Sequence, residues 1–208
     1  MNKFALDTAA RVYEILKDKD ILIAGGFARD LYYGKDFKDV DVIMAWPDEV
    51  PRASPTTATV EEMERLAYWC ISRYCLVRTD PYSDGWYFVR VCPNYHENSI
   101  AGSFDDRIGC VVKLKVLVEG TFVSVDILIP KNVDKAIDYV EEFDYNINQF
   151  TVNRDLSVTY HGGDSLQIDN KVREVGSYGR KPRLAKLKAK FPELDFSGAT
   201  TSDGVPTV

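Results

Sequence analysis

Residues 21–44 (ILIAGGFARDLYYGKDFKDVDVIM) constrain the fold of this chain more than any other segment. An apolar run leads into two glycines, a short Arg-Asp helix pattern and the strand pattern DVDVI. Because side chains alternate faces along a strand, Asp39 and Asp41 project to the same side, about 7 Å apart. Val40 and Val42 take the opposite face. The pattern predicts a strand with one buried face and a carboxylate face that could be open.

Two carboxylates at this spacing can hold a divalent cation beside a triphosphate, and a cation would offset the cost of acids next to an apolar strand. The alternative is two solvated acids on an edge strand, since Asp-x-Asp is a common string. Gly25 and Gly26 pose a similar choice. Glycines between a strand and a helix let the backbone approach a phosphate, but an ordinary turn also uses them.

Asp126 is the third candidate acid, isolated in the apolar run FVSVDILIP. An unpaired acid in such a run is costly. Two-metal phosphoryl transfer commonly uses a third carboxylate on a neighbouring strand, where it binds the metal that activates the attacking hydroxyl. The alternative is an aspartate at a sheet edge that accepts a backbone hydrogen bond. Lys113 and Lys115 are expected on the wet face of the preceding strand, from which one could reach a phosphate.

Hydrophobic periodicity and turn signals predict the other elements. We expect helices over 4–17, 27–33, 59–74, 133–143 and 183–191, and strands over 21–24, 40–45, 86–91, 110–118 and 121–129. Glu119-Gly120 is a hairpin signal, and Thr59 with Glu62 has the spacing of a capping box. Residues 149–160 indicate a small β excursion, 92–108 a mobile loop, and the segment from Ser197 a disordered tail.

Composition narrows the class of protein. A chain of 208 residues, 45% of them hydrophobic, can bury one sizeable core. No segment has the apolar length of a membrane helix, and the first residues do not resemble a signal peptide. Four cysteines without a CxxC pair and only two histidines argue against a zinc site. We therefore expect a cytoplasmic protein with reduced thiols and no membrane partner.

Charge is unevenly distributed along the chain. The formal net charge is -6, yet residues 171–190 contain eight Lys or Arg residues and one acid, Glu174. Such a segment suits a nucleic-acid backbone or a phosphate, and it equally suits a solvated helix face.

Two parts of the chain resemble a known family. GGFARDLYYG followed by KDVDV resembles the head-domain signature of class II CCA-adding enzymes and bacterial poly(A) polymerases, within the DNA polymerase beta-like nucleotidyltransferase superfamily. Further on, Asp144, Ile147 and Asn148 match the family motif D-h-T-I-N-A, and KPRLAKLKAKF resembles the basic neck helix. The resemblance extends over most of residues 20–192 and suggests a minimal, divergent member.

The resemblance implies an α+β fold of the polymerase-beta-like nucleotidyltransferase type, with a mixed β-sheet flanked by helices. It implies a catalytic head over residues 1–145 and a neck-like element with a basic helix over 146–194. Turn-forming residues without an apolar period predict a disordered tail over 195–208. It also implies Mg²⁺ or Mn²⁺ as cofactor, an NTP as substrate and a tRNA-like RNA 3′ end as acceptor. A partner chain or oligomer could supply RNA-gripping domains that the sequence lacks.

The same resemblance assigns roles to single residues. Asp39, Asp41 and Asp126 would ligate the catalytic metals, and Asp126 would lower the pKa of the acceptor hydroxyl through one of them. The remaining assignments are Gly25, Gly26, Arg29, Asp30, Lys38, Asp144 and Asn148 for the nucleotide, and Arg180, Lys181, Arg183, Lys186 and Lys190 for RNA or phosphate.

The sequence departs from the family at two points. Glu142 and Phe143 stand where the family has two arginines that help bind nucleotide phosphates. The base-selecting motif E-D-x-x-R is absent, and residues 180–183 (RKPR) stand near its expected place. Two other interpretations therefore remain open. One is a transferase that modifies a small molecule or a protein, as toxin and resistance-type members of the superfamily do. The other is a catalytically silent module that binds nucleotide or RNA.

Overall fold

A computed structural model of the chain describes residues 2–17, 20–53, 59–73, 86–91, 108–131, 135–163, 166–167, 170–175 and 181–199. The helices in these ranges are α1 (Lys3–Ile15), α2 (Gly26–Tyr32), α3 (Val60–Arg73), α5 (Ala136–Glu141), the 3-10 helix η1 (Asn146–Asn148) and α7 (Lys181–Lys190). The strands are β1 (Ile21–Ala24), β2 (Val40–Met44), β3 (Trp86–Val91), β4 (Ile108–Val118), β5 (Thr121–Pro130), β6 (Phe150–Val152), β7 (Val158–Tyr160), β8 (Lys171–Arg173) and β9 (Asp195–Gly198).

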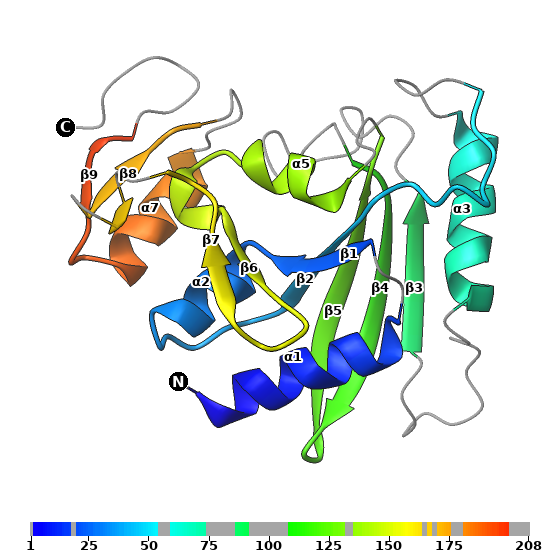
Figure 1. Cartoon of the computed structure of the whole chain (residues 1–208), viewed down its shortest axis with the longest axis horizontal. Coiled ribbons are helices and arrows are strands. Elements are labelled where there is room, and N and C mark those ends of the chain that lie inside the picture. The colour runs from blue at the N-terminus through cyan, green and yellow to red at the C-terminus, as the bar shows by residue number, and fades with distance from the viewer. Residues whose placement is uncertain are drawn as a thin grey trace.

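The architecture is α+β, as expected, with a mixed sheet flanked by helices (Figure 1). The described part of the chain forms a seven-stranded sheet in the order β3-β4-β5-β2-β1-β6-β7. Strands β2 and β5 are parallel, and the other neighbouring pairs in this sheet are antiparallel. Strands β8 and β9 form a separate parallel pair.

Each face of the sheet carries its own apolar cluster. On one face, Val40 and Val42 of β2 pack with the buried side of α1, including Val12. On the other face, Ile43 of β2 packs with α5 around Val140. Because successive strand residues point to opposite faces, Asp41 lies on the α5 face. The separation of acids from the larger apolar face, expected from the alternation, is confirmed.

Two local predictions about turns and caps are confirmed. The Thr59 N–H donates to Glu62 Oε2 at 2.7 Å and the Glu62 N–H donates to Thr59 Oγ1 at 3.2 Å, which is a reciprocal capping box. Glu119 and Gly120 have φ values of 47° and 80°, as a two-residue hairpin turn requires. The turn places Val118 opposite Thr121 and fixes the register of the whole hairpin.

The C-terminal part of the chain differs from expectation in several details. Strands β6 and β7 join the main sheet through β1, so the β excursion belongs to the core; the division into a head and a neck at residue 145 stays a prediction. Residues 195–198 form β9, where we expected the disordered tail to begin. Helix α5 is shorter than the expected 133–143. Residues 92–107, which include His96, and residues 200–208 lie outside the described ranges.

Helix α7 lies beside β8 and β9 at one side of the molecule, opposite α3 (Figure 1). Its buried residues Leu184 and Leu187, followed by Phe191, join the main apolar cluster, so α7 packs onto the same core as the sheet. None of the helices described is long and apolar enough to cross a membrane. Of the four cysteines, Cys70 and Cys110 are buried, and the other two lie outside the described ranges.

Candidate functional site

Three aspartates line one cavity on the α5 face of the sheet. Asp41 of β2 and Asp126 of β5 are register partners across the parallel strand pair, and Asp39 directly precedes β2. The cavity has a volume of about 690 Å³. Its walls come from α2, β2, β5, α5, η1 and α7, so it lies where the sheet, the helices and the C-terminal element meet. The structure thus brings together the three acids singled out in the sequence.

The acids at this cavity disturb one another electrostatically. Burial, together with the charges of Asp39 and Asp126, raises the pKa of Asp41 from 3.8 to about 7, against the opposing effects of Arg183 and Lys113. A carboxyl that resists ionisation beside two other acids is a place where a cation would be stabilising. Oxygen donors of this kind suit hard divalent ions such as Mg²⁺ or Mn²⁺.

The three carboxylates are the right kind of ligand for such an ion, but they are not already arranged to coordinate one. Among the described residues, no group of three or more His, Cys, Asp or Glu side chains has the geometry to hold a metal ion. One reason is visible on β4, where Lys113 lies opposite Asp126 in the hairpin register and forms an ion pair with it. Lys113 therefore neutralises one of the three acids. The two-residue turn at Glu119-Gly120 implies this pairing, a signal that sequence reasoning overlooked.

Gly25 lies against the acidic floor of the site. Its φ of 70° is in the region that favours glycine, and a Cβ there would lie 3.4 Å from the Phe143 ring and 3.7 Å from Asp41 Oδ2. Its N–H donates to the Phe150 carbonyl at 3.0 Å, so this amide is not free for a phosphate. Gly26, the first residue of α2, lines the cavity.

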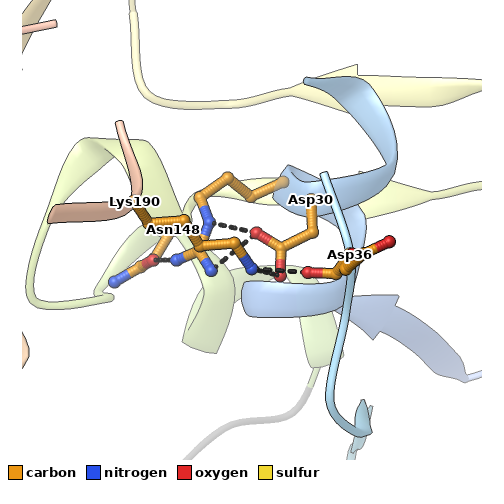
Figure 2. Close-up of polar contacts among 5 residues, drawn as sticks. Asp30, Asp36, Asn148 and Lys190 are labelled. Carbon is orange, nitrogen blue, oxygen red and sulfur yellow. Dashed lines mark hydrogen bonds and ion pairs between the residues drawn. The ribbon is translucent and has the colours of Figure 1, made fainter. Parts of the chain in front are cut away.

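Arg29 and Asp30 are buried and belong to one polar network. Figure 2 shows Asp30 of this network with Asp36, Asn148 and Lys190 around it. Arg29 Nε donates to Asp30 Oδ1 at 2.9 Å, and Arg29 Nη1 donates to Asn148 Oδ1 at 2.7 Å. From α7, Lys190 Nζ donates to Asp30 Oδ2 and to the Asp36 carbonyl, each at 2.6 Å. Residues that sequence reasoning assigned to a nucleotide are therefore also bonded to one another, and they join α2 to η1 and α7.

The same network continues to Asp144. Asn148 Nδ2 donates to Asp144 Oδ1 at 2.9 Å, and Arg183 Nη1 of α7 donates to Asp144 Oδ2 at 2.8 Å. Arg183 and Lys190, two of the cations expected to bind RNA or phosphate, thus form ion pairs with aspartates of the cavity wall. Lys186 lines the cavity between them along α7. Lys38 also lines it, largely exposed, with its Nζ 3.8 Å from Asp39 Oδ2.

Some site residues were missed or cannot be placed. Phe143 and Tyr139 line the cavity and make an edge-to-face contact, with ring centroids 5.4 Å apart. In the sequence, Phe143 was noted only because it stands where the family has an arginine. Lys181 begins α7, but the position of its side chain is not described. Arg180 lies outside the described ranges.

Neither a protein-family model nor a curated protein sequence matches the chain. Its fold is similar to solved structures of the Bacillus stearothermophilus CCA-adding enzyme in complex with CTP (14% identity, TM-score 0.41) and the Thermotoga maritima CCA-adding enzyme complexed with tRNA (14%, 0.42). It is also similar to a tRNA-processing enzyme in an apo form (16%, 0.45). These matches cover 91%, 90% and 93% of this chain, but only 38%, 33% and 39% of those.

Proposed function

We propose that this protein is a nucleotidyltransferase that moves a nucleotide from an NTP to an acceptor hydroxyl. The observation that supports this most is the pairing of Asp41 with Asp126 on neighbouring parallel strands, inside a cavity that Asp39 and Gly26 also line. A carboxylate cluster beside the start of a helix combines donors for cations with backbone donors for a phosphate, the two needs of triphosphate chemistry.

Asp39, Asp41 and Asp126 are the residues that would hold divalent ions such as Mg²⁺ or Mn²⁺. When bound, such ions supply charge neutralisation for a triphosphate and for the developing negative charge of the reaction. The raised pKa of Asp41 supports this assignment, because a carboxyl that is buried and lies beside two other acids is stabilised in its ionised form by a nearby cation.

In the proposed reaction, the acceptor oxygen forms a bond to the α-phosphorus while the bond to the β-phosphate oxygen breaks and pyrophosphate leaves. We assign Asp126 to the acceptor hydroxyl, whose proton it would accept. Lys113 must then release the Asp126 carboxylate, because the two are ion-paired. Gly26 and Lys38 are the cavity residues that we assign to the triphosphate. Positioning and charge neutralisation supply most of the rate gain in reactions of this type.

The first candidate acceptor is an RNA 3′ end, because α7 is rich in lysine and arginine. One observation favours a second candidate, a small molecule or a protein hydroxyl. Arg183 and Lys190 of α7 are ion-paired with Asp144 and Asp30, which lowers the positive charge that the helix can offer to an RNA backbone.

The test is to incubate the protein with each labelled NTP and Mg²⁺, with and without total RNA, and then to sequence the RNA 3′ ends. We expect incorporation that falls by more than about 100-fold in Asp41→Asn and Asp126→Asn, since loss of a metal-holding carboxylate removes transition-state charge stabilisation. Asp138→Asn, an exposed acid on α5, is the matched control. Label on RNA supports the first acceptor, and label on protein or small molecules supports the second. Binding of NTP without any incorporation contradicts the enzymatic proposal.

A further inference from the structure

The cavity walls hold more acids than bases, and almost every base is already paired. Six aspartates and five cations line the cavity. Arg29 and Lys190 pair with Asp30, and Arg183 pairs with Asp144. The remaining lining cations are Lys38, whose Nζ lies 3.8 Å from Asp39, and Lys186, for which the described part of the chain provides no ion pair.

Helix α7 holds Lys186 in a fixed place. Arg183, Lys186 and Lys190 are spaced three and four residues apart and therefore share one face of the helix. Arg183 Nη1 is bonded to Asp144 Oδ2 at 2.8 Å, and Lys190 Nζ is bonded to Asp30 Oδ2 at 2.6 Å. Leu184 and Leu187 are buried in the core from the same helix. The backbone is thus anchored on both sides of Lys186, while the ammonium group stays exposed at the cavity.

We propose that Lys186 binds the phosphates of the substrate nucleotide, so that the cavity-lining face of α7 belongs to the nucleotide site. This inference rests on the proposed function. A polyphosphate entering a cavity in which acids outnumber bases is repelled unless it meets cations. Bound metal ions supply part of that charge, and an unpaired ammonium on the wall supplies more.

The assignment also accounts for Glu142 and Phe143, the positions where the resemblance implies phosphate-binding arginines. Phe143 lines the cavity as an aromatic side chain, so it brings no positive charge to the nucleotide. The unpaired cation on the wall comes from α7 instead, about 40 residues further along the chain. A phosphate ligand of this kind makes the contribution of Lys186 grow with the number of phosphates on the ligand.

The test measures binding by titration calorimetry in Mg²⁺ buffer, first with each of the four NTPs and then with the di- and monophosphate of the tightest one. For Lys186→Ala we expect about 10-fold weaker NTP binding, which corresponds to about 1.4 kcal/mol, and monophosphate binding within about 2-fold of wild type. Lys186→Arg should retain most of the NTP affinity. Lys188→Ala is the matched control, because Lys188 lies on the same helix and does not line the cavity.

The outcomes separate the inference from the proposed function. If the wild-type protein binds no nucleotide, both are overturned. If wild type binds NTP and Lys186→Ala binds it equally well, the inference alone is overturned. It is also overturned if Lys186→Ala weakens binding of a single-stranded RNA and leaves NTP binding unchanged, since Lys186 would then belong to an RNA surface. Unchanged thermal unfolding of Lys186→Ala shows that the fold is intact.

Discussion

Asp41 of β2 and Asp126 of β5 lie at the same level of two parallel, neighbouring strands. Neighbouring strands are about 4.8 Å apart, so two carboxylates on the same face interact directly. That proximity, with burial and the charge of Asp39, is why the pKa of Asp41 is raised to about 7.

Asp41→Asn should change how stability depends on pH. The native pKa of about 7 exceeds the ordinary value of 3.8, so the native state holds this proton more tightly than the unfolded state. The resulting stabilisation is complete below about pH 4 and is lost as pH rises through 7, with an upper limit of about 4 kcal/mol. Urea unfolding in EDTA should show the variant close to wild type at pH 4 and more stable at pH 8. Parallel pH profiles would contradict the prediction.

Lys113→Met should lower the Mg²⁺ concentration needed to stabilise the protein. The ion must displace the Lys113 ammonium from Asp126, and the variant removes this competitor. We expect a few-fold lower half-saturating Mg²⁺ concentration and about 0.5–1 kcal/mol less stability without metal, since the lysine is partly exposed. Thermal unfolding across a Mg²⁺ titration measures both. Lys115→Met, on the same strand opposite Ser124, is the control, and identical titrations would count against displacement.

Gly25→Ala should impair activity more than its cost in stability explains. Gly25 and Gly34 have positive φ values of 70° and 64°. The ψ of -133° at Gly25 lies outside the left-handed helical region, so the backbone cost of alanine there should exceed the roughly 1–2 kcal/mol of a left-handed residue. A Cβ at Gly34 would enter open space, whereas a Cβ at Gly25 would contact the side chains of Phe143 and Asp41. Gly34→Ala should keep nucleotide incorporation, and Gly25→Ala should lose at least about 10-fold. Equal effects of the two on incorporation would show that the Gly25 contacts do not matter.

Asp30→Asn should destabilise the fold strongly. Asp30 is buried and accepts bonds from Arg29 and Lys190, so a neutral side chain leaves the buried Arg29 guanidinium without its counter-charge. The expected loss is about 2–4 kcal/mol in urea unfolding. Glu193→Gln removes an exposed ion pair with Lys35 and should cost no more than about 0.5 kcal/mol. Losses of similar size would mean that burial of the network contributes little.

Local signals in the sequence predicted most of the elements. The strand over 21–24 and the strand over 86–91 match the structure, and the capping box of Thr59 and Glu62 is formed. These features depend on periodicity and on contacts between residues close in sequence, which a sequence shows directly. The expected helix over 133–143 was too long because apolar residues beyond Glu141 also fit a helical period, although they belong to the turn into η1.

Contacts between distant segments could not be read from periodicity. The register that pairs Asp41 with Asp126 joins strands separated by the whole of α3, β3 and β4. The sequence suggested that the two acids lie on neighbouring strands, but it did not show that they are register partners. The ion pairs of Arg183 and Lys190 were missed for the same reason: a run of cations reads as a solvated or RNA-binding face until the acids opposite it are known. The pairing of Lys113 with Asp126 could have been predicted from the sequence, because the hairpin turn already fixes the register of the two strands.

The bond between Lys190 and Asp30 spans 160 residues of chain and has a consequence for biosynthesis. During translation, Asp30 of α2 leaves the ribosome long before α7 is made. A nascent chain stalled before α7 has emerged should therefore leave Asp30 with Arg29 but without Lys190, and the cavity open on one side. The chain would then become able to bind a ligand only late in synthesis, in a single step, when α7 packs against the core.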